Sequence, residues 1–156
     1  MHKPPSIVRF ERMWWISALL SLIAAYLSWD RVQNSIRARF AEDPALRANP
    51  FGAVVADWTQ LAGVTITIAW TVMVWFLVAR RANRAGRWLT VLTALLSGAQ
   101  LAILLGGLAL GRTLHPLSHS AAATAAILMV LATAALFAPS SRAWFGESDE
   151  AERQPI

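Results

Sequence analysis

The stretch "LAGVTITIAWTVMVWFLVARRANRAGRWLTVLTALLSG", residues 61–98, joins two apolar runs through a short link that holds four arginines and no acidic residue. The first run, residues 61–79, carries no charge, and the second begins at Trp88. A helix rises about 1.5 Å per residue, so about 20 apolar residues cross the hydrocarbon core of a bilayer. The stretch therefore predicts two antiparallel membrane-spanning helices joined by a basic hairpin.

Two further runs, residues 13–29 and 117–138, are similarly long and almost free of charge. Of the 156 residues, 56% are hydrophobic and only 15% are charged. A soluble four-helix bundle would show a polar outer face on each helix, and these runs show none. We therefore expect an all-α integral membrane bundle of four transmembrane helices within one membrane domain, residues 1–146. The helices are expected at about residues 13–29, 53–79, 88–111 and 117–138, and residues 147–156 as a disordered acidic tail.

The distribution of basic residues predicts the orientation in the membrane. Lysine and arginine number nine in the two tails and the second link together, and five in the first and third links. Positive charge in short loops stays in the cytoplasm, so we expect a bacterial inner-membrane protein with both termini cytoplasmic. The net charge of +5 is explained by this anchoring to anionic lipid headgroups, without a nucleic-acid partner. The expected headgroup anchors are Arg80, Arg81, Arg84, Arg87, Trp88 and Trp144.

The first link also carries a helical pattern. Val32, Ile36 and Phe40 recur every four residues, which places them on one face of a helix. This spacing predicts a short amphipathic helix in the first periplasmic link, lying on the membrane surface. The link is the largest piece outside the membrane. Its helix either closes the outer mouth of the bundle, which is the simpler expectation, or offers the best place for a membrane-protein partner to bind.

Polar residues follow one face of each of the first three helices, at spacings of three and four. Lipid tails offer no hydrogen-bond partners, so these faces should point inward. The first face holds Ser17, Ser21 and Ser28; the second Asp57, Gln60, Thr67 and Thr71; the third Thr90, Thr93, Ser97 and Gln100.

Three of these polar positions suggest contacts inside the membrane. Gln100 is the strongly polar side chain nearest to mid-membrane, and it joins helices or contacts a substrate. Asp57, one turn before Gln60, forms an ion pair with Arg112, serves as a proton or cation site, or lies at the interface beside water. The sequence leaves these alternatives open.

Small residues on the third helix predict close helix packing. Gly98, Gly106, Gly107 and Gly111 let a neighbouring backbone approach, either within the chain or across a homodimer. His115 and His119 are weak candidates for metal or haem ligands, since no third ligand is near in the sequence. We find no catalytic motif and no cysteine, and we expect neither catalysis nor a cofactor.

Three segments carry a resemblance to a group of proteins. "IVRFERMWWISALLSLIAAYLSWD", "WFLVARRANRAGRWL" and "LFAPSSRAWFG" resemble the helix ends of small, uncharacterised four-helix inner-membrane proteins of proteobacteria. The resemblance implies the same membrane fold. It implies no activity, since the group has none assigned, and no functional residue.

The expected function is a structural, accessory or assembly role in the membrane. A homodimeric small transporter or lipid-handling protein is the first alternative, and a haem-binding redox subunit is the second.

Overall fold

The computed structural model describes residues 3–43, 51–110 and 116–146, and this part of the chain is helical, with no strand. Four of its helices are long and apolar enough to cross a membrane. The expected all-α bundle of four membrane helices is confirmed, and the chain is a multi-pass helical membrane protein. In order, the elements are α1 (Pro5–Leu27), α2 (Trp29–Glu42), α4 (Gly52–Ala79), α5 (Arg84–Ala109), α6 (Pro116–Ala135) and the short 3₁₀ turns η1 (Pro139–Ser141) and η2 (Ala143–Phe145).

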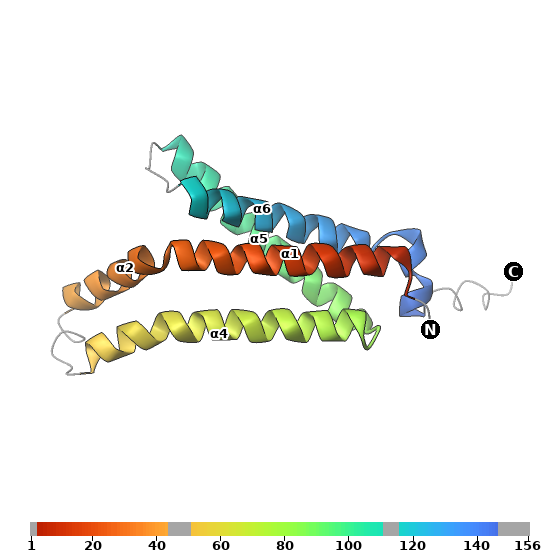
Figure 1. Ribbon diagram of the computed structural model, residues 1–156, viewed down its shortest axis with the longest axis horizontal. Coiled ribbons are helices and arrows are strands. Elements are labelled where there is room, and N and C mark those ends of the chain that lie inside the picture. The colour runs from red at the N-terminus through yellow and green to blue at the C-terminus, as the bar shows by residue number, and fades with distance from the viewer. Residues whose placement is uncertain (1–2, 44–50, 111–115, 147–156) are drawn as a thin grey trace, which may run out of the picture.

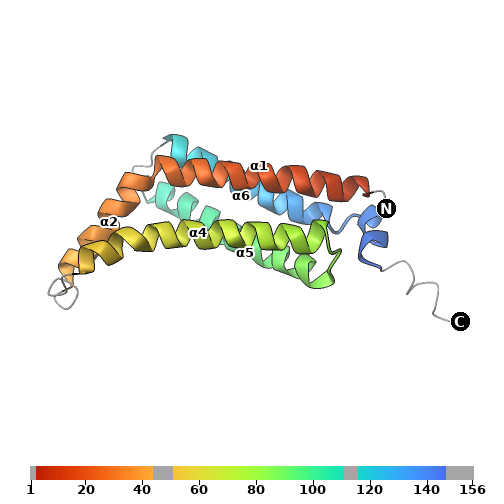
Figure 2. The ribbon, with the colours of Figure 1, turned by 60° about the horizontal axis from the view of Figure 1, so that its bottom comes forward.

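The four long helices run along one another in two pairs (Figures 1 and 2). The closest pair is α1 with α6, and α5 packs against α6. Helix α4 contacts α5 and α2, and it touches α1 over a shorter stretch. The start of α1, the link between α4 and α5, and the turns η1 and η2 all lie at one end (Figure 1). We call this the arginine-rich end, after the four arginines at positions 80, 81, 84 and 87.

Helix α1 begins at Pro5, well before the expected start near residue 13. Proline suits a first helical position, because its missing N–H would have no partner there. The added turns are not lipid-facing on every side, since Ile7 and Phe10 are fully buried. Packing against the rest of the bundle therefore extends this helix beyond its apolar run.

The core lies at the arginine-rich end, where side chains from α1, α4, α6 and η2 meet. Its buried residues are Ile7, Phe10, Trp14, Val74, Val78, Met129, Ala132, Leu136 and Phe145. Trp14 lies at the start of the first apolar run, a level at which tryptophan usually contacts lipid headgroups. It is instead completely buried, and its Nε1 donates a hydrogen bond to the Thr71 carbonyl oxygen at 3.2 Å.

The link between α4 and α5 is a tight turn held by three local features. Ala82 adopts a left-handed backbone with φ of 48°. Asn83 caps α5, since its side-chain oxygen accepts a hydrogen bond from the Ala85 amide at 2.8 Å. At Gly86, an added Cβ would lie 2.9 Å from the Leu77 Cβ, so only glycine allows the helices to approach this closely. Gly86 was not among the packing glycines expected from the sequence.

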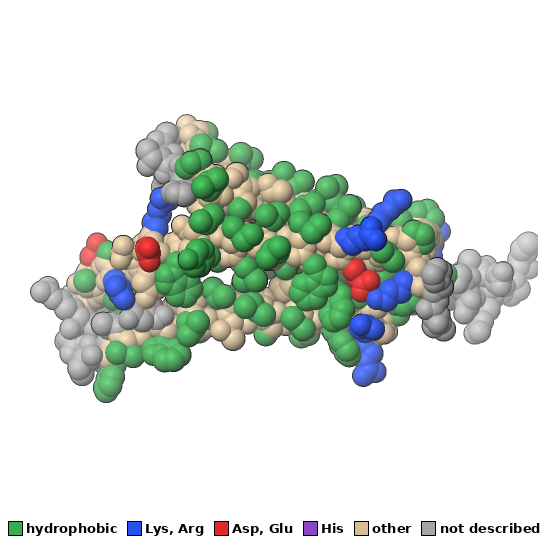
Figure 3. Space-filling view, in the orientation of Figure 1, with side chains coloured by type: hydrophobic (Ala, Val, Ile, Leu, Met, Phe, Trp, Pro, Cys, Tyr) green, Lys and Arg blue, Asp and Glu red, His purple; other side chains and the backbone are tan. Residues whose placement is uncertain are grey.

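The surface agrees with a membrane setting. In the space-filling view, hydrophobic side chains cover the middle of the molecule, and charged side chains gather toward its two ends (Figure 3). This distribution matches a bilayer, in which an apolar hydrocarbon core lies between two layers of polar headgroups.

The amphipathic helix predicted in the first link is present as α2, and it packs along the first part of α4. Two of its apolar residues, Val32 and Ile36, line a cavity between the helices. Part of the apolar face expected to rest on the membrane surface is therefore turned toward the bundle.

Candidate functional site: an uncharged cavity between the helices

A cavity of about 600 Å³ lies between α1, α2, α4 and α5, with Met129 of α6 at its wall. This volume falls within the range of small-molecule sites. Along α4 the wall runs from Thr59 to Val72, which corresponds to about 20 Å of helix. We call it the bundle cavity. Its wall includes Trp15, Ser21, Ser28, Val32, Ile36, Gln60, Gly63, Thr67, Trp70, Thr71, Thr93, Ser97 and Gln100.

The three polar faces expected to point inward meet at this cavity. Helix α1 contributes Ser21 and Ser28, and α4 contributes Gln60, Thr67 and Thr71. Helix α5 contributes Thr93, Ser97 and Gln100. The structure thus brings together residues that the sequence could only place on separate helix faces.

Two other members of these faces are buried in helix contacts instead. The Ser17 hydroxyl donates to the Ala125 carbonyl oxygen at 2.8 Å and joins α1 to α6. Thr90 is fully buried, and its carbonyl oxygen accepts a hydrogen bond from Thr133 of α6 at 3.3 Å. Both residues lie toward the arginine-rich end, so each polar face changes from packing to cavity lining along its length.

Most hydroxyl groups of the cavity wall donate to the helix that carries them. Thr67, Thr71 and Ser97 each bond to the carbonyl oxygen four residues earlier, at 2.8 to 2.9 Å. Such a bond satisfies the hydroxyl proton and keeps acceptor capacity on the oxygen. The wall therefore offers uncharged hydrogen-bond acceptors to whatever occupies the cavity.

The two glutamine amides of the wall are incompletely bonded. Gln60 donates through Nε2 to the Trp29 carbonyl oxygen at 3.4 Å, whereas its Oε1 is buried without a partner. Gln100 makes no hydrogen bond to any residue that the structure describes, and its side chain is exposed to the cavity. An amide without a partner in hydrocarbon costs free energy. The expected joining of helices by Gln100 is not seen among the described residues.

The cavity is closed on its arginine-rich side by aromatic residues. Trp70 of α4 donates through Nε1 to the Thr93 hydroxyl of α5 at 3.0 Å. Trp15 of α1 contacts Trp75 of α4, with ring centroids 5.4 Å apart. Each of these two contacts joins two helices. Together they fix the end of the cavity that lies nearest to the arginine-rich end.

Charged groups are absent from the described wall of the cavity. The Asp57 side chain and Arg112 lie outside the described residues, so the expected ion pair stays a prediction. His115 and Gly111 also lie outside them. His119 has its Nδ1 3.3 Å from the Ser118 hydroxyl. Within residues 3–43, 51–110 and 116–146, no three His, Asp or Glu side chains are grouped to hold a metal.

Gly98 and Gly106 of α5 do not bring described helices of this chain together. A Cβ added at Gly98 or Gly106 would meet no atom within 4 Å. Of the two alternatives that the sequence left open, packing within the chain is therefore not seen at these two positions among the described residues. Gly107 is half-buried. Packing of Gly98 or Gly106 against a second chain stays a prediction.

The expected headgroup anchors lie at the arginine-rich end. The Arg80 guanidinium lies 5.5 Å from the Trp75 ring and that of Arg81 5.5 Å from Phe76, and Trp88 is 67% exposed. Trp144 differs from this expectation. It is half-buried, and its Nε1 donates to the Val78 carbonyl oxygen at 3.0 Å, so it fastens η2 to the end of α4.

Comparison with known proteins gives no relative. No family model, no curated protein and no solved structure matches the chain. The function must therefore be inferred from the cavity and the surfaces of this protein alone.

Proposed function

We propose that the protein binds a lipid-like molecule in the bundle cavity, as an apolar chain that carries an uncharged hydrogen-bonding group. The observation that supports this most is the pair of glutamines, Gln60 and Gln100, which line one cavity with incompletely bonded amides. A ligand hydroxyl would donate to the Gln60 Oε1, and a hydroxyl, ester or carbonyl oxygen would accept from the Gln100 amide nitrogen. The proposal favours the lipid-handling alternative.

The chemistry of the wall narrows the ligand. Its tryptophans and aliphatic residues suit a hydrocarbon chain, and its length of about 20 Å along α4 leaves room for several carbon atoms in a row. A carboxylate or an ammonium group would lose its hydration there without gaining an opposite charge. We therefore propose a neutral amphiphile, bound or moved without any chemical step.

The structural, accessory or assembly role remains a second proposal, and so does a homodimer. The basis of both is the outer surface of α5, which no other helix of the chain covers at Gly98 and Gly106. The redox alternative has less support, since among the described residues only His119 offers an imidazole as an axial haem ligand.

Filling the cavity tests the proposal. Gly63 lines the cavity, and a Cβ added there meets no atom within 4 Å, so Gly63→Leu extends into open space. Purified protein would be extracted with organic solvent and the released lipids quantified by mass spectrometry. We expect one neutral species bound to the wild type and reduced about tenfold in the variant.

The matched control is Gly106→Leu. Gly106 is also a helical glycine with open space around it, and it does not line the cavity. Both variants gain the same helix propensity and the same apolar surface. Equal lipid content in the two variants would contradict the proposal.

Removing the amide of Gln100 separates binding from packing. Because this amide has no partner in the described chain, Gln100→Leu should weaken lipid binding and leave thermal stability unchanged or higher. A loss of stability together with a loss of dimer in native mass spectrometry would instead support the homodimer.

We further propose that the protein lies in a bacterial inner membrane with both termini cytoplasmic. The support is the distribution of basic residues, nine on the side of the termini and five on the other. A reporter that works only in the periplasm should be inactive after residue 156 and active when inserted in residues 44–50. The reverse pattern would overturn this orientation.

A further inference from the structure

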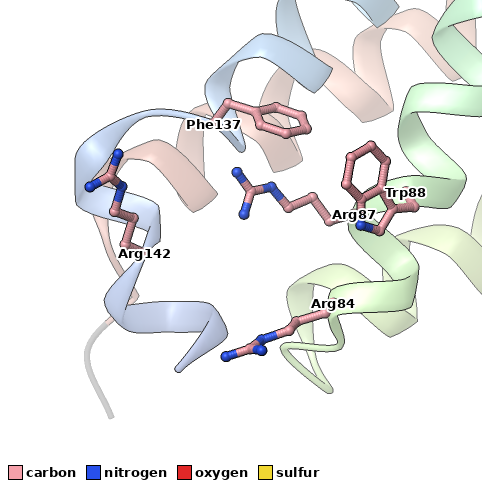
Figure 4. A pocket seen from close by; sticks show the side chains of 5 residues that line it. All are labelled: Arg84, Arg87, Trp88, Phe137 and Arg142. Atoms are coloured by element: carbon pink, nitrogen blue, oxygen red, sulfur yellow. The ribbon is translucent and has the colours of Figure 1, made fainter. Parts of the chain in front are cut away.

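A second pocket, of about 430 Å³, lies at the arginine-rich end and is basic. It is lined by Arg84, Arg87, Trp88, Phe137 and Arg142. Figure 4 shows Arg84 and Arg87 reaching from the start of α5 toward the segment after α6, which carries Phe137 and Arg142. Three arginines from two distant parts of the chain therefore line one hollow, with the Arg142 guanidinium turned away from that of Arg87 (Figure 4).

The position of this pocket on α5 adds to its positive potential. The N-terminus of a helix carries a partial positive charge, which acidic residues usually offset. The first turn of α5 has no acidic residue and begins with Arg84, one turn before Arg87. No acidic side chain is among the described residues that line the pocket. The basic side chains and the N-terminus of the helix together favour an anion at this pocket.

Two of the arginines are held in place by the protein. Arg84 donates through Nε to the Phe145 carbonyl oxygen and through Nη2 to that of Gly146, both at 3.2 Å. The Arg87 guanidinium lies 4.0 Å from the centre of the Phe137 ring. Stacking uses the face of a guanidinium, whereas its N–H donors point outward in its plane. This fixed arrangement reduces the entropy lost on binding an anion.

The third arginine contributes charge without a structural bond. The Arg142 side chain is exposed, and it forms no hydrogen bond or ion pair with any described residue. It follows η1, which is tied to α6 by the hydrogen bond from the buried Ser141 hydroxyl to the Leu136 carbonyl oxygen at 2.6 Å. The backbone that positions Arg142 is therefore secured even though its side chain is not.

The remaining wall is aromatic and faces outward. Trp88 is 67% exposed, Phe137 is 42% exposed, and their ring centroids lie 6.4 Å apart. Both residues stand where a membrane span begins or has just ended, since α5 starts at Arg84 and α6 ends at Ala135. Aromatic residues at this level contact the glycerol region and the first carbons of lipid chains.

We propose that this pocket binds a phosphate ester, with the headgroup of an anionic phospholipid as its source at the membrane surface. Guanidinium forks match phosphate oxygens in geometry and charge, and the aromatic wall fits the lipid portion. Free phosphate offers the same anionic oxygens without that portion. The site is independent of the proposed function, because none of its five residues lines the bundle cavity.

Native mass spectrometry of the full chain in neutral detergent tests the proposal. Phosphatidylglycerol, diacylglycerol and inorganic phosphate are added separately as probes. We expect retention of phosphatidylglycerol and not of diacylglycerol, and about tenfold weaker retention in Arg142→Gln. The matched control is Arg81→Gln, which removes the same charge from the same end but outside the pocket. It should retain the lipid like the wild type.

The outcomes distinguish binding at this pocket from a general electrostatic attraction of anionic lipid to the basic end of the protein. Equal losses in Arg142→Gln and Arg81→Gln would overturn the proposal, because they would indicate diffuse electrostatics. Binding of inorganic phosphate that is as tight as that of phosphatidylglycerol, and lost in Arg142→Gln, would support the phosphate site with a soluble source.

A second variant tests whether acidic residues of the same chain occupy the basic pocket in place of a lipid. The acidic residues Glu147, Asp149 and Glu150 follow Gly146 in the sequence and are replaced together by amides. Retention of phosphatidylglycerol by both the wild type and this variant supports the proposal. Retention by this variant alone would overturn it.

Discussion

At the arginine-rich end, side chains of α1, α4 and α6 are buried against one another. Farther along, α1 and α4 instead enclose, together with α2 and α5, a cavity of about 600 Å³. The two regions are built from similar apolar sequence. In lipid there is no hydrophobic gain from bringing helices together, so shape-complementary packing and hydrogen bonds decide how closely they associate. The packed end therefore provides stability, and the open part is where we propose that a ligand binds.

The same helix shows this difference over a few turns. On α1, Ser17 is buried and bonded across to α6, while Ser21, one turn later, lines the cavity. On α5, Thr90 is buried, while Gln100 has no partner in the described chain. A polar residue thus stabilises the bundle or serves its cavity according to its distance from the arginine-rich end.

The largest contrast is expected from truncating an aliphatic side chain in each region of α1. Ile7 is fully buried in the packed core, and Leu22 is 39% exposed and lines the cavity. Ile7→Ala should lower the free energy of unfolding by about 2 kcal/mol, because the empty space cannot be filled by lipid. Leu22→Ala should change it by less than about 0.5 kcal/mol. Reversible unfolding in mixed micelles measures both, and equal losses would show that the two regions are packed alike.

A smaller contrast is expected from adding a methyl group to a glycine of α5. At Gly86 the new Cβ meets Leu77 at 2.9 Å, so Gly86→Ala should cost about 1 to 2 kcal/mol. At Gly106 nothing lies within 4 Å, and Gly106→Ala should stabilise by about 0.5 kcal/mol through helix propensity. Reversible unfolding in mixed micelles measures the change in the free energy of unfolding for both variants. Destabilisation by Gly106→Ala would point to a second chain packed on that surface.

The smallest contrast compares two serines of α1. Ser17→Ala removes the hydrogen bond to the Ala125 carbonyl oxygen and should cost about 0.6 kcal/mol. Ser21→Ala removes no hydrogen bond among the described residues and should leave stability unchanged. If thermal unfolding shows instead that Ser21→Ala destabilises the delipidated protein, the cavity is held together by contacts of that hydroxyl.

Much of the candidate site could be anticipated from spacing alone. The polar faces of three helices were expected to point inward, and eight of their residues now line one cavity. Spacing could not show that Gln60 and Gln100 would remain incompletely bonded, because this depends on how far apart the helices lie. It also suggested close contacts at Gly98 and Gly106, whereas the close approach is at Gly86, beside the turn.

The sequence by itself determined the membrane setting, the number of spans and the helical face on which each polar residue lies, because apolar length and a period of 3.6 residues are local properties of the chain. Only the tertiary structure decided that α1 and α6 pack tightly while α4 leaves a cavity, and that Arg142 joins Arg84 and Arg87 in one pocket. These outcomes depend on how well side chains of distant segments fit together. Lipid supplies no hydrophobic driving force for that fit, and the local sequence pattern does not predict it.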